Sequence, residues 1–360
     1  MIRRNMEDEE DEEEEQRQQL AGNPDWMSRL PAELLDVPLW NLALPDYRVT
    51  FKLLPATWSK VTRLSLVPPG SHDSMSFCLD VSSPVLRSES CLLRVFDRLF
   101  PCWTRPCVYR WATTQQSVLS DQCDLGVRFL DLRIARRPAG GRTLLFAHGL
   151  YTLMAVTEAL DELASWLDAH PKEVVIVSCS HFDSLTDGDH ARLVENIVTL
   201  FGDKLCSSKE TPTLRSCWSR GQQVILSYVN QQVVLQHPEL WAEIPYRYAD
   251  SPDPKKVIAF LEDQKRRTRP AGFYVSGLNL TEDAPYVLLH PLQTMRKMTM
   301  KGLTLLLSWA SEQRPGPEDG RVNIVCCDFV DVSQFCSLVI GLNDKLRPVC
   351  RTQGDATGCA

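Results

Sequence analysis

The chain has 360 residues, of which 44% are hydrophobic, and its formal net charge is −7. This length is typical of one large domain or two ordinary ones, and the apolar content is sufficient for a full core. We expect no transmembrane segment, no signal peptide and no nucleic-acid partner, because long apolar runs, a basic leader and a basic stripe are all absent from the sequence. The 13 cysteines lack metal-ligand spacing, so we expect reduced core thiols in a cytosolic protein.

The first part of the chain is strongly charged. Residues 6–19 are almost entirely Asp, Glu, Gln and Arg, and such a run repels itself and buries nothing. We therefore expect residues 1–24 to form a disordered acidic tail, residues 25–348 to form a single domain, and residues 349–360 to form a second flexible tail.

Two segments near the start of this domain resemble each other. Leu39–Pro45 and Thr62–Pro68 each predict a short strand that runs into a proline. A compact barrel needs only one such strand at this point. Residues 46–60 are therefore predicted to be an inserted loop, or an alternative exon that displaces the original strand.

The turn Pro69–Met75 places His72 beside Asp73, directly after the apolar run Leu64–Val67. A histidine titrates near neutral pH and can take or give a proton there. A turn that follows a strand is also where α/β barrels hold their reactive groups.

Beyond this turn, apolar strand-like runs alternate with helical patterns. The predicted strands are Val127–Ile134, Leu144–Ala147, Val174–Cys179, Val224–Tyr228, Gly272–Gly277 and Val322–Phe329. The predicted helices are Thr157–His170, Asp189–Phe201, Pro254–Arg267, Thr294–Gln313 and a last helix with Asp331 at its N-cap. This alternation, without a dinucleotide-binding glycine motif, predicts an α/β fold in which a largely parallel sheet closes into a barrel.

Two predicted strand ends carry charged or titratable side chains. Asp131 and Arg133 share one face of their strand because side chains alternate with a period of two. They form either an ion pair that closes the barrel mouth or a site in which Arg133 grips phosphate. His148 shares a face with Phe146 and is expected at the same mouth. His72, Arg133 and His148 together offer a general base, a cation and a general acid.

Two further strand ends are candidates. His181 follows the run Val174–Ser180 and can line the mouth. Asp328 ends the last apolar run, where a carboxylate can orient a histidine across the barrel and raise its basicity.

These residues resemble the X region of phosphatidylinositol-specific phospholipases C. The matching motifs are Gly70-Ser71-His72-Asp73-Ser74, the strand with Asp131 and Arg133, and Phe146-Ala147-His148-Gly149. Residues 25–348 as a whole resemble the small eukaryotic group that contains this X domain alone, and the 46–60 stretch falls outside the pattern. The resemblance implies a distorted TIM (β/α)8 barrel of the phospholipase-C-like phosphodiesterase type.

The resemblance also implies roles for the site residues. His72 would take the proton from the inositol 2-hydroxyl, and His148 would protonate the leaving diacylglycerol oxygen. Asp73 and Arg133 would neighbour the phosphate and the attacking hydroxyl, with Asp131 in support. The implied substrate is an inositol phospholipid at a membrane surface, reached from the cytoplasm by peripheral contact, and the first product is a cyclic inositol phosphate.

Arg133 and Asp73 also bear on the cofactor question. In the calcium-dependent enzymes that the sequence resembles, a calcium-ligating carboxylate stands at the position of Arg133. An arginine there supplies positive charge and repels a cation, so we expect metal-independent chemistry with no cofactor. Ser180 and His181 stand where the bacterial enzymes carry a lysine, and they are candidate substrate-binding residues.

Membrane contact and alternative functions remain open at this level. Trp103, Trp111 and Tyr151 could touch lipid near the mouth, but we expect each to pack in the core. Protein partners are not indicated. The alternatives to the enzyme are a catalytically weak module that binds inositol phosphates or lipid, and another phosphodiester hydrolase on the same barrel, such as a glycerophosphodiesterase. The latter class usually needs an acidic metal cluster.

Overall fold

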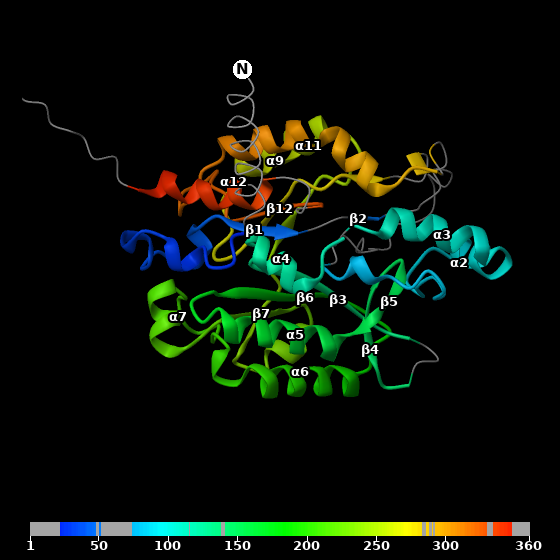
Figure 1. Ribbon diagram of the computed structural model, residues 1–360, viewed down its shortest axis with the longest axis horizontal. Coiled ribbons are helices and arrows are strands. Elements are labelled where there is room, and N and C mark those ends of the chain that lie inside the picture. Colours follow the sequence, from blue (N-terminus) through cyan, green and yellow to red (C-terminus); the bar gives the residue numbers. More distant parts are fainter. Residues whose placement is uncertain are drawn as a thin grey trace, which may run out of the picture.

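A computed structural model describes residues 22–47, 50–51, 74–114, 116–137, 141–282, 286–287, 290, 292–329 and 334–347 of the chain (Figure 1). His72 and Asp73 lie outside these ranges, as do both chain ends. No helix in the described part is long and apolar enough to cross a bilayer. The described cysteines are free thiols, and most of them are buried.

In the described part of the chain, eight strands follow one another in a parallel path, as expected for an α/β barrel. Each neighbouring pair is parallel, and the first strand lies between the second and the last. In spatial order these strands are β8 (Leu240–Trp241), β7 (Val224–Tyr228), β6 (Val175–Asp183), β3 (Phe129–Arg136), β1 (Leu44–Tyr47), β12 (Ile324–Cys327), β10 (Val275–Gly277) and β9 (Tyr246–Arg247). The fold class is therefore the distorted TIM-type barrel that the sequence predicts.

The predicted closure of the barrel is not confirmed at one seam, because the sheet pairings of the described residues do not join β8 to β9. Only residues 242–245 separate these two strands. A parallel neighbour needs a crossover of roughly a dozen residues or more. The connection is too short for that, and both strands have only two residues.

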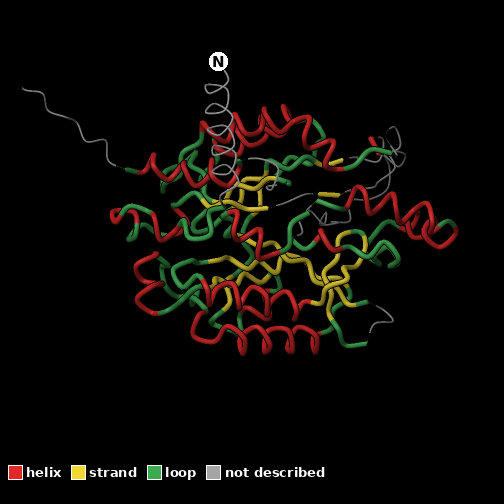
Figure 2. Tube along the Cα trace, viewed as in Figure 1, coloured by secondary structure: helices red, strands yellow, loops and turns green. Residues whose placement is uncertain are grey.

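Helices cover the outside of the sheet (Figure 2). In Figure 1, α5 and α6 lie on one side, beside β3, β6 and β7, while α9, α11 and α12 lie on the other, beside β1 and β12. The bounds are α4 (Leu119–Leu125), α5 (Val156–Ala169), α6 (Asp187–Phe201), α7 (Leu214–Arg220), α8 (Gln231–Val234), α9 (Pro254–Lys265), α11 (Met295–Glu312) and α12 (Phe335–Gly341). Helix α5 shows why such a segment forms a helix that covers the sheet. Leu160, Leu163 and Leu167 recur at helical spacing and are buried, and Pro171 follows shortly after the helix ends.

Inside the barrel, apolar side chains fill the amino-terminal half. They come from successive strands and pack with Trp26 and Met27 below them; they are Leu44, Phe129, Ile176, Ile225, Val275 and Ile324. Because strand side chains alternate, the next inward positions are Asp131, Ser178 and Ser227. The interior therefore turns from apolar to polar towards the carboxyl ends of the strands.

A buried ion pair lies at the amino-terminal ends of β3 and β6. Arg128 and Glu173 are both fully buried, with 2.7 Å between Arg128 Nη2 and Glu173 Oε2. Arg128 also donates to the carbonyl oxygens of Cys123 and Pro24. Buried charges are tolerated when their hydrogen bonds are satisfied in this way. Asn23 and Pro24 are thus hydrogen-bonded to the folded body through Arg128.

Several elements depart from the sequence predictions. Residues Leu39–Asn41 form a 3-10 helix, and β1 continues through Pro45 to Tyr47 instead of stopping at the proline. Asp46 and Tyr47 are therefore strand, and Thr50–Phe51 form β2, which pairs with β11 (Thr281–Glu282). The rest of 46–60 lies outside the described residues, so the insertion stays a prediction. Gln334 holds the N-cap position of α12, and Asp331, the predicted N-cap residue, lies outside the described residues.

Two further pairs of elements lie at the carboxyl ends of the strands. The helices α2 (Cys91–Leu99) and α3 (Pro101–Ala112) form a hairpin, and β4 (Leu144–His148) and β5 (Leu150–Ala155) form an antiparallel hairpin on β3. In Figure 1 the helical pair projects past β4 and β5. The other 3-10 helices among the described residues are Met27–Arg29, Ala32–Leu34, Ser76–Cys78, Gly202–Lys204 and Leu342–Leu346.

Candidate active site

The chain enters the barrel mouth at Ser74. The Ser74 N–H donates to the carbonyl oxygen of Asp131 (3.0 Å), and the Asp131 N–H donates to Ser74 Oγ (3.1 Å). Gln122 Nε2 also donates to the Ser74 carbonyl (2.9 Å). These bonds fix the residue that follows His72 and Asp73 against the strand that carries Asp131.

Arg133 and His181 are cross-strand neighbours on β3 and β6. The pairing register shifts between Leu132 and Arg133, so that Ser180 is an extra residue opposite the two. Such a bulge re-aims the side chains around it. Strand β6 continues to Asp183, so His181 lies inside the strand and not at its end. The Ser180 hydroxyl oxygen is buried, and it has no hydrogen-bond partner in the described part of the chain.

His148 reaches the site from the β4–β5 hairpin. We expected it at the end of a barrel strand, but β4 runs antiparallel to β3 and lies outside the parallel path. The His148 Nδ1 lies 2.7 Å from the carbonyl oxygen of Ala112, at the end of α3. A carbonyl only accepts, so this bond fixes the proton on Nδ1. Nε2 is buried and makes no hydrogen bond to any described residue.

Arg133 acts on the pKa values of both histidines. The pKa of His148 is lowered to about 3, mainly by burial and then by the charges of Arg133 and His181, while the hydrogen bond to the Ala112 carbonyl opposes the shift. Burial lowers the pKa of His181 to about 4, with Arg133 in the same direction and Asp183 opposed. His148, His181 and Arg133 therefore form one electrostatic group, and both imidazoles are neutral at pH 7 while the site is empty.

Two acids that the sequence analysis missed join this group. Burial raises the pKa of Glu89 to about 7, Arg133 opposes that rise and Asp183 adds to it. Asp183 accepts hydrogen bonds from the Ser88 hydroxyl (2.8 Å) and the Ser184 hydroxyl (2.6 Å). Glu89 directly precedes the N-cap of α2 and has no motif around it, so no local pattern could have identified it.

Asp328 lies in a second acidic group. It is fully buried, burial raises its pKa well above the usual range, and Thr299 Oγ1 donates to it (3.3 Å). Glu282, also fully buried, has its pKa raised by burial and by the charges of Asp328 and Glu89. The next residue, Phe329, has a φ of 52°, which is rare for a bulky side chain.

The predicted residues thus fall into two connected groups. Arg133, His148 and His181 act on one another, Asp131 is joined to Ser74 at the same strand, and Glu89 links this group to Asp328 and Glu282. The expectation that Asp328 orients a histidine stays a prediction, because His72 lies outside the described residues. Within the described ranges, no three His, Cys, Asp or Glu side chains are grouped to hold a metal ion.

This barrel is similar to solved phosphatidylinositol-specific phospholipases C. The alignment with the enzyme of Listeria monocytogenes has a TM-score of 0.56 at 17% identity and covers 89% of this chain and 98% of that one. The alignment with the enzyme of Staphylococcus aureus has a TM-score of 0.59 at 16% identity and covers 90% and 99%. The molecule therefore has the fold of a phospholipase-C-like phosphodiesterase.

Curated relatives narrow this class, although no protein-family model matches the chain. The chain is 44% identical over 322 residues to PI-PLC X domain-containing protein 1 of Danio rerio, covering 89% of this chain and 96% of that protein. The human protein 1 is 42% identical over 325 residues (90% and 93%), whereas protein 3 of Danio rerio is 35% identical over 326 residues (89% and 92%). The chain belongs to the PI-PLC X domain-containing protein family and is most similar to its member 1 proteins.

Proposed function

We propose that the chain is a metal-independent phosphoric diester hydrolase that cleaves inositol phospholipids in the manner of a phospholipase C. The observation that carries this proposal is the hydrogen bonding of the two ring nitrogens of His148. Its Nδ1 is tied to Ala112 and its buried Nε2 has no partner among the described residues, close to the Arg133 guanidinium. A general acid needs such a fixed ring with one nitrogen open to the leaving oxygen.

The reaction follows from the charges of the mouth. His72 accepts the proton of the inositol 2-hydroxyl, whose oxygen attacks phosphorus. His148 Nε2 gives a proton to the departing diacylglycerol oxygen, and Arg133 neutralises the developing charge on phosphate. The free site holds His148 neutral. The phosphodiester anion offsets the Arg133 charge and raises the His148 pKa, so His148 becomes protonated when substrate is bound.

The remaining residues support this reaction. Asp131 and Asp73 hold Arg133 and the attacking hydroxyl, while Asp328 orients His72 and raises its basicity. Ser180 and His181 bind the head group, consistent with the buried, unpartnered Ser180 hydroxyl of the described structure.

Head-group release from vesicles of mixed inositol lipids tests the reaction. With excess chelator, we expect activity in the unmutated chain and a fall of at least about 100-fold in His72→Ala and His148→Ala. His237→Ala is the matched control, because His237 bonds to Glu239 away from the mouth (2.9 Å). Unchanged release in His148→Ala would refute the mechanism, and activity that only calcium restores would refute metal independence.

The α2–α3 hairpin supports action at a membrane surface. Four exposed apolar residues repeat at helical spacing on one face of α2, namely Leu92, Val95, Phe96 and Leu99, and the exposed Phe100 and Trp103 follow at the turn and in α3. Trp103 is 79% exposed, so the expectation of core packing is wrong for it, whereas Trp111 and Tyr151 are buried as expected. Contiguous apolar patches on soluble proteins mark contact surfaces.

Both ends of this hairpin touch the candidate site. Glu89 directly precedes the N-cap residue of α2, and Ala112, the last residue of α3, binds His148. A bilayer that receives the apolar face would therefore lie beside the mouth. The chain would then take its lipid head group from the surface without leaving it.

A vesicle-sedimentation assay tests this contact. Replacing Phe96, Leu99 and Trp103 with serine should abolish vesicle binding and lipid cleavage but leave hydrolysis of the water-soluble inositol 1,2-cyclic phosphate unchanged. Leu305→Ser, on the outer face of α11, is the control for an exposed leucine elsewhere. Vesicle binding of the triple variant equal to that of the unmutated chain would refute the contact.

A further inference from the structure

Two neighbouring helices, α9 and α11, begin with cationic side chains. Helix α9 carries two lysines in its first turn, and α11 carries an arginine and a lysine in its first turn and a further lysine one turn later. All five of these residues are exposed. We call this set the basic rim and define it by Lys255, Lys256, Arg296, Lys297 and Lys301.

The basic rim lies beside the mouth. Thr299, which stands between the two lysines of α11, donates to Asp328, directly after β12 (3.3 Å). Residues two positions apart on a helix point about 200° apart, so these lysines lie on the side of α11 that faces away from Asp328. Helix α9 begins at the same level, because a Cβ on Gly302 would stand 3.1 Å from the Pro254 side chain.

The cations of the basic rim stand where the backbone disfavours them. The amino-terminal end of a helix carries partial positive charge, so acidic side chains stabilise it and cations destabilise it. The first turns of α9 and α11 contain no acidic residue. Lys297 and Lys301 are also four residues apart on the helix surface, where like charges repel each other. The local structure therefore gives no reason for these charges.

The described part of the chain offers the basic rim little negative charge. Asp253 adjoins it, but the Asp253 side chain caps α9 by accepting the Lys255 backbone N–H (2.9 Å). The sequence has no acidic residue at positions 254–261 and 286–311, which include all five cations. Within the described ranges, none of the five forms an ion pair with a carboxylate.

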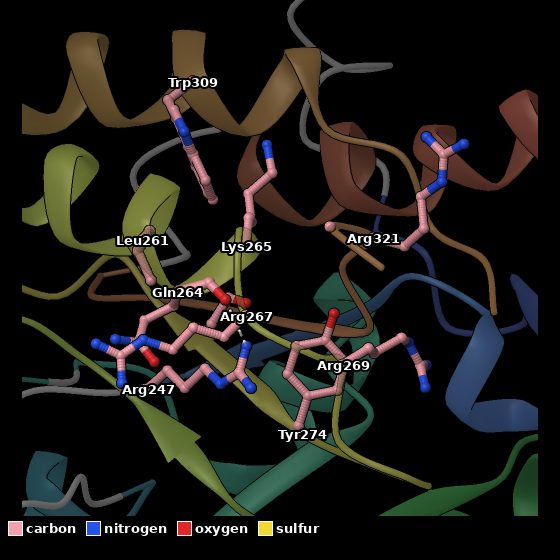
Figure 3. Close-up of a pocket in the computed structure, with 11 residues that line it drawn as sticks. Arg247, Leu261, Gln264, Lys265, Arg267, Arg269, Tyr274, Trp309 and Arg321 are labelled. Atoms are coloured by element: carbon pink, nitrogen blue, oxygen red, sulfur yellow. Dashed lines mark hydrogen bonds between the residues drawn. The ribbon is translucent and has the colours of Figure 1, made fainter. Parts of the chain in front are cut away.

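Cations also gather at the opposite end of α9, among them Lys265 and Arg267 (Figure 3), but there they have acidic partners. Lys265 Nζ lies 2.9 Å from Glu262, and Arg267 Nη2 lies 3.2 Å from Asp263. The cations of the basic rim lack such pairs among the described residues, in a chain whose net charge is −7. This difference indicates a negatively charged partner outside the described chain.

The basic rim and the apolar α2–α3 hairpin lie on the same side of the molecule. Helix α11 contacts α3, and the Tyr286 ring, shortly before α11, meets the Trp111 ring of α3 edge-on with 5.9 Å between centroids. Exposed apolar and cationic side chains thus lie beside one opening. This combination is typical of surfaces that rest on bilayers containing anionic lipid.

We propose that the basic rim binds the anionic surface of a lipid bilayer, through the head groups of acidic phospholipids that are not the substrate. Such a surface attracts each nearby lysine or arginine, and it supplies the negative charge that the described chain does not. Lysine side chains are long and flexible, so they reach head groups without needing one fixed geometry. The inference rests on the membrane contact proposed above and adds that lipid charge controls its strength.

Vesicle sedimentation without any inositol lipid tests the basic rim independently of cleavage. The two vesicle types are phosphatidylcholine alone and phosphatidylcholine mixed with phosphatidylserine. Phosphatidylserine should strengthen binding of the unmutated chain, and added salt should weaken that gain. The double variant Lys297→Gln/Lys301→Gln should bind the mixed vesicles at least about tenfold more weakly than the unmutated chain. Its binding to phosphatidylcholine alone should be unchanged.

The matched control is Lys172→Gln/Lys209→Gln. It removes the same charge from two exposed lysines that precede β6 and α7, away from the mouth, and it should keep the phosphatidylserine effect. Thermal unfolding checks that the rim variant is folded. That variant should unfold at no lower temperature than the unmutated chain, because it loses a like-charge repulsion.

The outcomes separate this proposal from the apolar contact. If phosphatidylserine does not strengthen binding of the unmutated chain, or if the rim variant keeps the full effect, the basic rim has no such role. If instead the Phe96, Leu99 and Trp103 triple variant binds both vesicle types like the unmutated chain, the apolar contact fails. A phosphatidylserine effect that is lost only in the rim variant would then still support the basic rim.

Discussion

Ser74 and Asp131 bind each other reciprocally: the Ser74 N–H donates to the Asp131 carbonyl, and the Ser74 hydroxyl accepts the Asp131 N–H. Both residues are fully buried. The pair fastens the segment that carries His72 and Asp73 to the strand that carries Arg133. Ser74 is in this sense a positioning residue.

Ser74→Ala should therefore reduce kcat more than it changes KM. The substitution leaves the buried Asp131 N–H without its acceptor, which costs about 1–3 kcal/mol of stability. Urea unfolding and steady-state kinetics measure the two effects. Ser76→Ala is the control, since this buried serine bonds to Thr114 and not to Asp131. Equal kinetic losses in the two variants would show that Ser74 has no special relation to the site.

The two neutral histidines predict acid sensitivity. Unfolded histidine titrates near pH 6.5, whereas the folded pKa is about 4 for His181 and about 3 for His148. Between these values the unfolded chain binds more protons, so stability falls as the pH falls from 6.5 towards 4. In urea unfolding at several pH values, His181→Gln should flatten this slope by up to about 1.4 kcal/mol per pH unit. An unchanged slope would contradict a buried, neutral His181.

Asp328 predicts the opposite dependence. Its pKa is raised well above the usual range by burial, so its stabilising protonated form is lost as the pH rises through that pKa. Asp328→Asn mimics the protonated acid and should retain stability at high pH where the unmutated chain loses it. Its head-group release should nevertheless fall, because the Asp328 carboxyl can ionise against the His72 imidazolium that forms during the reaction, whereas an amide cannot. Full activity in Asp328→Asn would remove Asp328 from the mechanism.

Gly149 holds the hairpin of His148 close to α3. Its φ is +68°, and a Cβ there would stand 2.8 Å from Val108 Cγ1. Gly149→Ala should cost about 1–3 kcal/mol and lower activity, because α3 supplies the Ala112 carbonyl that fixes His148. Gly221→Ala isolates the backbone cost, since Gly221 has a φ of +69° and open space around it. The Gly149 variant should lose more stability than this control, as thermal unfolding would show.

The parallel strands β3, β6, β7, β10 and β12 were predictable because each contains a short run that is buried on both faces. The strand Val224–Tyr228 agrees with its prediction at both ends. The seam between β8 and β9 was not predictable, because two-residue strands carry no periodic signal. His148 lies near Arg133, as expected, but it comes from an antiparallel hairpin and not from a barrel strand. Its run reads as a barrel strand, but only its pairing with β3 shows that it runs antiparallel.

Sequence reasoning could not identify the acidic residues Glu89 and Glu282 either, because no local pattern marks them. Glu89 and Glu282 lie far from Arg133 and Asp328 in sequence and belong to no motif. Only the three-dimensional fold brings their charges together. Sequence reasoning could identify Arg133, Asp131 and Asp328 as candidates, because the strand ends of a parallel barrel converge on one mouth.

In the α2–α3 hairpin, the residues that attach it to the barrel differ from those that form its exposed apolar face. Asp97, nearly buried on α2, accepts from the Val85 N–H (3.2 Å) and from Arg105 Nε of α3 (2.7 Å). This polar clasp fastens the hairpin to the body, so its outward apolar side chains have no structural duty. Substitutions on that face should therefore change what the hairpin contacts without changing how the barrel packs.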